Sequence, residues 1–258
     1  MSSEGFGRVN RLHHEVFNDK NERRFVGSIE STMRLELLRL AEKDANAYCN
    51  ICWAAFNDAF MGLMYPNGYT ESARAWAKGS LLEDRQENPD RNRIMKVIDH
   101  DLPESDSNGK VIGIGYWKFY TQERTQADLD AEDKKSEEKG HPPDCNVALL
   151  DEFHGNIDKY KREILGRQPY VLLNVLAVLP EYHRKGVGGM LIKEGLQQAD
   201  QLGLQSYLEA SPMGRALYQR MGYEQVREFE FDARKWGLDR DLPHVCMLRP
   251  AQVANGQS

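Results

Sequence analysis

One short segment of the chain has the residues to hold a phosphate group. Residues 180–189 read PEYHRKGVGG, between an apolar run and an amphipathic pattern. Glycines in such a turn let the backbone approach a ligand, and the first amide groups of the helix that follows have no acceptor within it. The helix dipole adds positive potential, and His183, Arg184 and Lys185 add side-chain charge. The segment therefore suits a pyrophosphate.

The same segment lacks two well-known nucleotide-binding patterns. The P-loop pattern G-x-x-x-x-G-K-[ST] is absent, and the Rossmann pattern G-x-G-x-x-G, counted from Gly186, fails at Leu191. The segment also follows several predicted strands, rather than belonging to a first strand–helix–strand unit. These features argue against a nucleotide-binding oxidoreductase. A purely structural interpretation stays open, since glycines at a strand–helix turn also permit a tight corner.

Other residue types that do chemistry are scattered. Cys49 and Cys52 have C-x-x-C spacing, but no second pair accompanies them and their surroundings have a helical pattern. Small buried thiols are therefore favoured over a zinc or redox site. His13 and His14 lack a matching set of ligands. No metal site is predicted.

The elements that must position the glycine segment are clearest in the last hundred residues. Residues 170–179 are almost uninterruptedly apolar, as expected of a strand buried on both faces. A helix is predicted from about 187 to 202, with one apolar face and Gly203 as its end. Further predicted elements are a strand at 206–209, a short helix at 212–221, and closing strands near 223–231 and 245–248.

The first part of the chain is read by the same periodicities. They predict strands at 35–40, 94–98 and 111–120. They also predict three helices: one at 44–60, one that begins after an N-cap at Thr70, and one at about 146–165. Residues 121–140 carry mixed charge and hardly any apolar content, which indicates a solvated excursion. The whole pattern predicts one α/β domain with a mixed sheet.

The domain is expected to span residues 34–250, with a helical insertion at about 121–165. Residues 1–33 are polar and lack clear periodicity, so we expect a partly flexible N-terminal extension. Residues 251–258 are expected to form a flexible C-terminal tail.

Composition narrows the class of protein. The 258 residues include 40% hydrophobic and 29% charged residues, a mixture typical of a soluble globular domain. The formal net charge of −6 argues against a nucleic-acid partner, which needs a basic footprint. No apolar run approaches the roughly 18–20 residues of a membrane span, and residues 1–10 lack the apolar core of a signal peptide. With four cysteines, the chain is expected to be a reduced, cytoplasmic protein.

Two motifs carry a resemblance to a known family. The segment HRKGVG at 183–188 resembles the Q/R-x-x-G-x-G/A signature with which acetyltransferases of the GNAT superfamily hold acetyl-CoA. The segment SPMGRALYQRMGY at 211–223 resembles that superfamily's N-x-x-A-x-x-L-Y-x-x-x-G-F motif. Both occur in family order, and the similarity covers about residues 33–250. Within the superfamily, the chain looks most like fungal members of unassigned substrate.

This chain departs from the family motifs at three positions. His183 takes the usual Gln or Arg position, Ser211 replaces Asn, and Gly214 replaces Ala. His183 can still offer a side-chain donor, and backbone amides do not depend on side-chain identity. The resemblance implies a GNAT-like acyl-CoA N-acyltransferase fold, with a central, mostly antiparallel sheet flanked by helices.

The resemblance also implies acetyl-CoA as cosubstrate, with backbone groups of the apolar strand pairing with its pantetheine arm. The N–H of Val178 would polarise the thioester carbonyl. The hydroxyl of Tyr218 would protonate the departing sulfur as general acid, or Tyr218 is simply a tyrosine packed beside Leu217. The implied residues for acetyl-CoA are Leu176, Ala177, Val178, His183, Arg184, Lys185, Gly186, Val187, Gly188, Gly189, Ser211 and Tyr218.

The general base is less clear from the sequence, since residues 170–179 contain no carboxylate. Glu209, at the end of the next predicted strand, is the best placed acid, and a structural carboxylate is the alternative. Asp58 and His154 are weaker candidates. A water chain to bulk solvent would need no dedicated base.

Acetyl transfer by direct attack to a primary amine of a small molecule is the leading prediction for function, with the protein a monomer or homodimer and without a membrane partner. The alternatives are a non-catalytic acyl-CoA-binding or sensing domain, and an acetyltransferase for protein lysines or N-termini, such as those of histones or ribosomal proteins. We expect an acceptor pocket built from residues 56–65, 69–82 and 146–165. Their aromatic residues favour an aromatic or partly apolar amine; these are Phe56, Phe60, Tyr65, Trp76 and Phe153.

Overall fold

The computed structural model describes residues 33–56, 58–104, 108–239 and 244–252. The expected N-terminal extension, with His13 and His14, and most of the expected C-terminal tail lie outside the described residues. In the described part of the chain, no helix combines the length and apolar character needed to cross a membrane.

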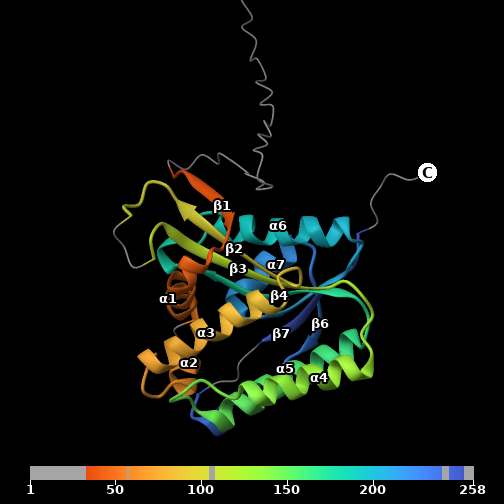
Figure 1. The fold of residues 1–258 in the computed structure, drawn as a ribbon. Coiled ribbons are helices and arrows are strands. Elements are labelled where there is room, and N and C mark those ends of the chain that lie inside the picture. The colour runs from red at the N-terminus through yellow and green to blue at the C-terminus, as the bar shows by residue number, and fades with distance from the viewer. Residues whose placement is uncertain (1–32, 57, 105–107, 240–243, 253–258) are drawn as a thin grey trace, which may run out of the picture.

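One sheet of seven strands forms the centre of the described structure (Figure 1). The strands are β1 (Leu35–Arg39), β2 (Asn92–Asp99), β3 (Val111–Tyr120), β4 (Tyr170–Val178), β5 (Ser206–Ala210), β6 (Glu224–Glu228) and β7 (Val245–Arg249). Their order in the sheet is β1-β2-β3-β4-β5-β7-β6. Only β4 and β5 pair in parallel, and the other neighbours are antiparallel. The predicted mixed, mostly antiparallel sheet is therefore confirmed.

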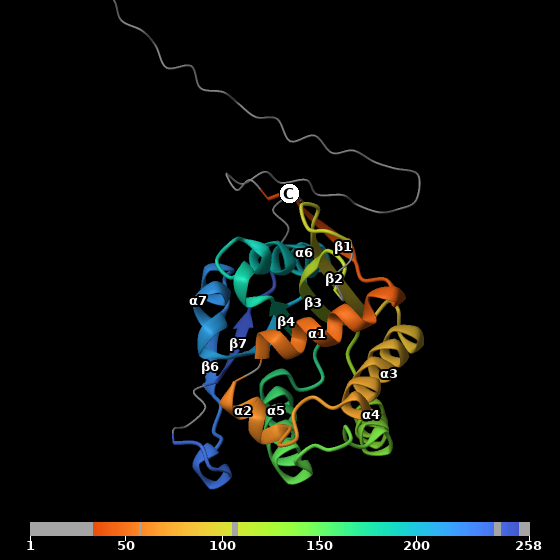
Figure 2. The same ribbon diagram turned by 90° about the vertical axis from the view of Figure 1, so that its left-hand side faces the viewer.

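Helices cover both faces of this sheet (Figure 2). They are α1 (Ala45–Phe56), α2 (Ala59–Met64), α3 (Glu71–Glu87), α4 (Gln126–Lys139), α5 (Val147–Leu165), α6 (Val187–Gln201) and α7 (Pro212–Arg220). Short 3₁₀ turns lie at η1 (Glu42–Asp44), η2 (Pro180–Tyr182) and η3 (Ala233–Trp236). The apolar clusters place α6 and α7 against one face and α1, α2, α3 and α5 against the other.

Close contact between α6 and β3 depends on glycine. A Cβ atom at Gly195 of α6 would lie 2.1 Å from Cε2 of Trp117 in β3. Below the helix, a Cβ at Gly115 would lie 3.2 Å from Cβ of Leu191. The indole Nε1 of Trp117 donates a hydrogen bond to the Leu191 carbonyl at 3.3 Å. The helix is thus seated directly on the sheet, and this fixes where its N-terminus lies.

The predicted helix at 44–60 is wrong in one respect, because it is two helices. Helix α1 ends at Phe56, and α2 begins at Ala59. Asp58 is the reason for the second start, since its Oδ1 accepts a hydrogen bond from the Met61 amide at 2.9 Å and caps α2.

Residues 121–140, predicted as a solvated excursion, contain the helix α4. A capping box starts it, in which Thr125 and Asp128 satisfy each other's backbone amides. Arg124 anchors its base: the guanidinium lies 4.8 Å from the centre of the Tyr120 ring and donates to the Gly166 carbonyl at 3.2 Å. Polar and cation–π contacts, rather than an apolar stripe, hold this helix, and ion pairs of Lys135 with Glu87 and of Lys139 with Glu83 join it to α3.

The close contact at Gly195 predicts that the stability of the protein is sensitive to a side chain at this position. Gly195→Ala should destabilise the protein by about 1–3 kcal/mol, since the new methyl group overlaps the Trp117 ring and α6 must lift. The matched control is Gly79→Ala in α3, where a Cβ would meet nothing within 4 Å. There the better helix propensity of alanine should be neutral or add up to about 1 kcal/mol. Denaturant unfolding measures both, and equal effects of the two changes would contradict the close seating.

Candidate functional site

The sheet opens between β4 and β5. Their parallel pairing consists of only two residue pairs, Val171 with Ser206 and Leu172 with Tyr207. Beyond these pairs both strands continue, to Val178 and Ala210, without pairing to each other. An opening bordered by two strands therefore lies in the middle of the sheet.

A β-bulge in β4 marks the start of this opening. On β3, Trp117 pairs with Leu173 and the preceding Tyr116 pairs with Val175, so Asn174 is the extra residue. Asn174 is exposed, whereas the residues before it are buried. The prediction of a strand buried on both faces therefore holds only for the first part of β4.

Backbone groups of β4 face the opening. The Leu179 amide donates to the Ile112 carbonyl at 3.0 Å, which makes the opposed residues Val178 and Gly113 a non-hydrogen-bonded pair. By the alternation of an antiparallel ladder, the N–H and C=O groups of Val178 and Leu176 point away from β3. Ala177 lies between them, with its backbone directed to β3 and its side chain in the core.

His183 fixes the end of this strand. Its Nε2 lies 3.0 Å from the Val178 carbonyl oxygen, so the ring donates a hydrogen bond to that oxygen. The imidazole therefore holds the turn after β4, and its predicted role as a donor to a phosphate would need a different ring orientation.

Two helix N-termini meet the opening, because α6 follows β4 and α7 follows β5 at the carboxyl ends of these parallel strands. At the N-cap of α6, Gly186 has the left-handed φ of 87°, and no side chain caps the helix. Arg184 and Lys185 are exposed beside it. At the other helix, the side chain of Ser211 makes no capping bond. The free amides and the two cations can together hold a pyrophosphate.

We call the start of α6, residues 184–189, the cradle. Its remaining glycines, Gly188 and Gly189, lie on the first turn of α6. A Cβ at Gly188 would lie 3.1 Å from Cδ2 of Leu217 in α7, so this glycine also has a packing role. At Gly189 the nearest atom would be Cε of Met221 at 3.8 Å, which leaves room for a side chain. Val187 is buried beneath them.

Tyr218 lies on the α6 and α7 face of the sheet. Its side chain is buried, and its ring meets the Tyr223 ring edge-on at 6.1 Å between centroids. Burial raises the pKa of the Tyr218 hydroxyl, which therefore keeps its proton at neutral pH. No described residue forms a hydrogen bond with this hydroxyl. The Tyr218 hydroxyl thus carries a proton and has no hydrogen-bond partner among the described residues.

Glu209 lies on the opposite face. Along β5, Leu208 and Ala210 join the cluster that contains Tyr218, so the alternating side chains of Tyr207 and Glu209 point to the α5 side. Oε1 of Glu209 is buried without a hydrogen-bond partner. Burial raises the pKa of this carboxyl, although Lys161 acts in the other direction. A carboxyl with a raised pKa takes up a proton more readily than an exposed glutamate does.

Two polar residues near Glu209 were not singled out from the sequence. Asn174 and Glu209 each lie two residues beyond the last β4–β5 pair, on the same face of the sheet. His244 precedes β7, where Cys246 is opposite Glu209. Its Nδ1 is buried without a partner, and burial lowers the pKa of its imidazole. Asn174 is one polar residue within an apolar run, and His244 is a single histidine in a polar segment. Neither pattern indicates a functional site.

The weaker base candidates are placed less favourably. Asp58 is engaged as the cap of α2, and His154 is exposed on α5. Among the residues expected at the acceptor pocket, Phe60 packs against Phe153 with centroids 4.9 Å apart, inside a core cluster. Tyr65 packs edge-on against Trp53 at 5.9 Å. These aromatic residues have structural partners, so they indicate little about the acceptor.

Metal and thiol chemistry receive no support. Within the described ranges, no group of three or more His, Cys, Asp or Glu side chains is arranged to hold a metal ion. Burial raises the pKa of Cys52 to about 12 and also raises that of Cys49, so neither is an activated thiolate.

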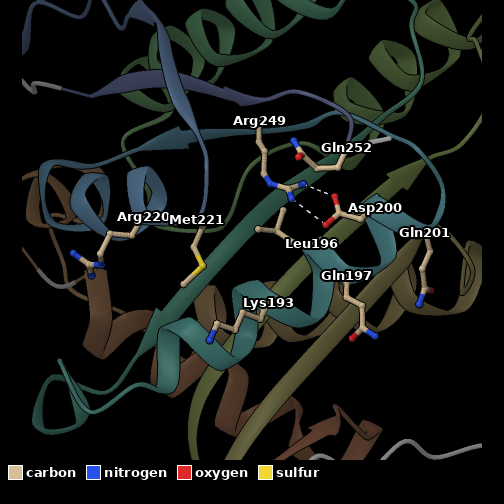
Figure 3. Close-up of a pocket in the computed structure, with 9 residues that line it drawn as sticks. All are labelled: Lys193, Leu196, Gln197, Asp200, Gln201, Arg220, Met221, Arg249 and Gln252. Carbon is tan, nitrogen blue, oxygen red and sulfur yellow. Dashed lines mark hydrogen bonds and ion pairs between the residues drawn. The ribbon is translucent and has the colours of Figure 1, made fainter. Parts of the chain in front are cut away.

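A groove of about 620 Å³ lies along the outer side of α6 (Figure 3). Its lining residues are Lys193, Leu196, Gln197, Asp200, Gln201, Arg220, Met221, Arg249 and Gln252. Arg249 and Asp200 form a two-pronged ion pair across it, at 2.5 and 2.9 Å. None of the predicted site residues lines this groove, which is thus separate from the opening between β4 and β5.

Residues 147–225 match the family model described as the acetyltransferase (GNAT) domain. This stretch contains β4, α6, β5 and α7, and therefore both sides of the opening. The chain carries a GNAT acetyltransferase domain and is an acyltransferase. The family expected from the two motifs is thereby confirmed.

Solved structures are similar to this chain at low sequence identity. The C-terminal condensation domain of Ebony, in complex with beta-alanyl-dopamine, has a TM-score of 0.58 at 11% identity, covering 84% of this chain and 99% of that one. A structure of histone acetyltransferase HPA2 and related acetyltransferase from Corynebacterium glutamicum has a TM-score of 0.49 at 18% identity, covering 85% and 98% of the two chains. No curated protein matches the sequence.

The burial of Glu209 predicts a pH-dependent stability. Because the pKa of its carboxyl is higher in the folded chain than in the unfolded chain, the folded protein binds more protons above the ordinary glutamate pKa. Stability from this group is complete below the unfolded pKa and is lost as pH rises through the folded one. Glu209→Gln should therefore gain melting temperature relative to wild type as pH rises from about 4 to about 8. The same difference in melting temperature between the two proteins at every pH would contradict the buried environment of Glu209.

Proposed function

We propose that the protein is an acetyl-CoA-dependent N-acetyltransferase that acts on a primary amine of a small molecule by direct attack. One observation supports the proposal: at the opening between β4 and β5, the cluster that contains Tyr218 lies on one face of the sheet and the buried carboxyl of Glu209 lies on the other. An amine can then enter from the Glu209 side while the leaving group departs on the Tyr218 side.

The opening fits the parts of acetyl-CoA. The backbone groups of Leu176 face into it and can pair with the amides of the pantetheine arm. The free amides at the start of α6, together with Arg184 and Lys185, can hold the pyrophosphate. The unpartnered hydroxyl of Ser211 lies at the start of α7, at the same opening.

Bound acetyl-CoA supplies an acetyl group activated as a thioester. Glu209 would accept the proton that the amine loses when it attacks. The Val178 amide, which points into the opening, would stabilise the negative charge on the carbonyl oxygen. Tyr218 would donate its proton to the sulfur. His183, by holding the Val178 carbonyl, would keep that peptide group in place.

The non-catalytic acyl-CoA sensor is the competing proposal, and protein acetylation is a second. Burying an oxygen of Glu209 without a partner costs free energy, which favours a site that uses this carboxyl over one that only binds. The experiment is a thiol-release assay with acetyl-CoA and a panel of small amines, lysine peptides and N-terminal peptides. Turnover with small amines supports the proposal, turnover with peptides alone redirects it, and acetyl-CoA binding without release of thiol supports the sensor.

We also propose a cytoplasmic location and a monomeric or homodimeric state. The four cysteines are free thiols, as expected in a reducing compartment. Light scattering, with and without acetyl-CoA, measures the oligomeric state.

The cradle at α6 can be tested with a pair of variants of the same shape. Acetyl-CoA should raise the melting temperature of wild type by mass action. Gly189→Asp should weaken this binding at least about tenfold relative to Gly189→Asn, because it places a negative charge beside the pyrophosphate. Without ligand, Asp at the third helical position should be as stable as Asn or slightly more so. Equal acetyl-CoA affinity of the two variants, by calorimetry, would show that the pyrophosphate lies elsewhere.

The proton donor can be tested by removing one oxygen atom. Tyr218→Phe keeps the ring and its packing, so acetyl-CoA affinity should change little. Loss of general acid catalysis should lower kcat by about 10²–10⁴-fold. A purely structural tyrosine would instead give normal turnover with a stability change of about 1 kcal/mol at most. Steady-state kinetics and a melting curve on the same preparation separate these outcomes.

A further inference from the structure

The ring of Tyr218 lies against the backbone of α7, one turn after Gly214. A Cβ atom at position 214 would lie 2.5 Å from Cε2 of Tyr218, 3.0 Å from Cζ and 3.1 Å from the hydroxyl oxygen. Real Cβ atoms do not approach ring carbons this closely. The ring thus occupies the space that any other amino acid at position 214 would need for its side chain.

The ring cannot easily move to another place. Only 8% of Tyr218 is exposed, and it belongs to a cluster with Leu208 and Ala210 of β5 and Tyr223. Interiors of this kind are close-packed, so a shift of the ring has to displace these neighbours.

Nothing but packing places the hydroxyl of Tyr218. Among the described residues it has no hydrogen-bond partner that could hold it in position. The contact with Gly214 on one side and the cluster on the other therefore determine where the proton donor lies. A misplacement of about 1 Å is enough to cost a reaction of this kind on the order of 10²-fold.

We infer that Gly214 is a positioning residue for the Tyr218 hydroxyl, which it lets lie close to the α7 backbone, at the depth needed to reach the leaving group. The inference rests on the proposed role of Tyr218 as proton donor. Alanine stands at this place in the motif that the segment resembles, so the tyrosine of this chain lies closer to its helix than an alanine would permit.

Helix propensity alone and the ring contact predict opposite effects of Gly214→Ala on the melting temperature, and this makes the inference testable. Glycine inside a helix is less favourable than alanine, so Gly214→Ala would raise the melting temperature if position 214 were only a helical residue. If the ring contact dominates, the same change pushes the ring outward, lowers kcat by about 10- to 100-fold and leaves the KM for acetyl-CoA nearly unchanged. The assay uses the best amine from the thiol-release panel.

A control in the same helix separates the two effects. Ala216 is exposed on α7, so Ala216→Gly changes helix propensity without touching the ring. It should lower the melting temperature by a few degrees and leave kcat unchanged. A similar loss of kcat in Ala216→Gly and Gly214→Ala would overturn the inference, since a general loosening of α7 would then explain both.

A double-mutant cycle tests whether Gly214 acts through the hydroxyl. In a Tyr218→Phe background, Gly214→Ala should cause no further loss of kcat, because the proton that it misplaces is already gone. An equal loss in both backgrounds overturns the inference. Normal turnover of Tyr218→Phe itself would overturn the proposed proton donor instead, so the two failures are distinguishable.

Stability keeps the inference testable even if Gly214→Ala folds poorly. Tyr218→Leu removes the ring atoms that approach position 214. In this background Gly214→Ala should raise the melting temperature, whereas it should lower or leave unchanged that of the protein with Tyr218. A rise of the same size in both backgrounds would show that the ring contact imposes no constraint.

Discussion

The candidate site depends on the point at which β4 and β5 stop pairing. Two parallel strands would ordinarily continue their ladder, because a backbone group that is buried without a partner costs about 1–3 kcal/mol. Here the ladder ends after the pair of Leu172 and Tyr207, and the bulge at Asn174 turns β4 away. The amide and carbonyl groups released in this way are the ones that a ligand strand, such as the pantetheine arm, could satisfy.

The same opening separates the proposed proton donor from the proposed proton acceptor. Tyr218 and Glu209 approach it from opposite faces of the sheet, and burial raises the pKa of both side chains. The tyrosine therefore holds its proton, and the carboxyl takes up a proton more readily than an exposed glutamate does. Because the sheet stands between them, a proton cannot pass directly from one to the other. In the proposed reaction two different protons move, one from the amine to Glu209 and one from Tyr218 to the sulfur.

Much of this arrangement could be predicted from the sequence, for physical reasons that differ between elements. The periodic apolar face of α6, its glycine-rich start and the apolar run of β4 are local signals, and they gave these elements nearly residue by residue. Helix α4 was read as an excursion because Arg124 and a capping box hold it, and such contacts leave no apolar period. The bulge at Asn174 depends on how β3 pairs with β4, which no local pattern records.

Residues brought together by the sheet were the hardest to predict. Glu209 could be chosen because it ends a strand, but its unpartnered oxygen results from packing against α5. His244 lies near Glu209 only because β7 pairs with β5. The departures from the family motif were visible, yet their meaning was not. From the sequence, Gly214 differs from the motif only by lacking the methyl group of alanine. The structure shows that the Tyr218 ring lies where that methyl group would be.

Glycine explains why these parts fit together so closely. A glycine within a helix costs roughly 0.5–1 kcal/mol relative to alanine, and α6 and α7 accept that cost at Gly195 and Gly214. In both cases an aromatic ring, of Trp117 or Tyr218, lies where a methyl group would be. The first contact fixes the height of α6 above the sheet and so the position of its N-terminus. The second, together with the cluster around the Tyr218 ring, is inferred to fix the depth of the Tyr218 hydroxyl. Helix propensity is thus sacrificed at two places, and the proposed phosphate-binding end of α6 and the proposed proton donor can then reach the same opening.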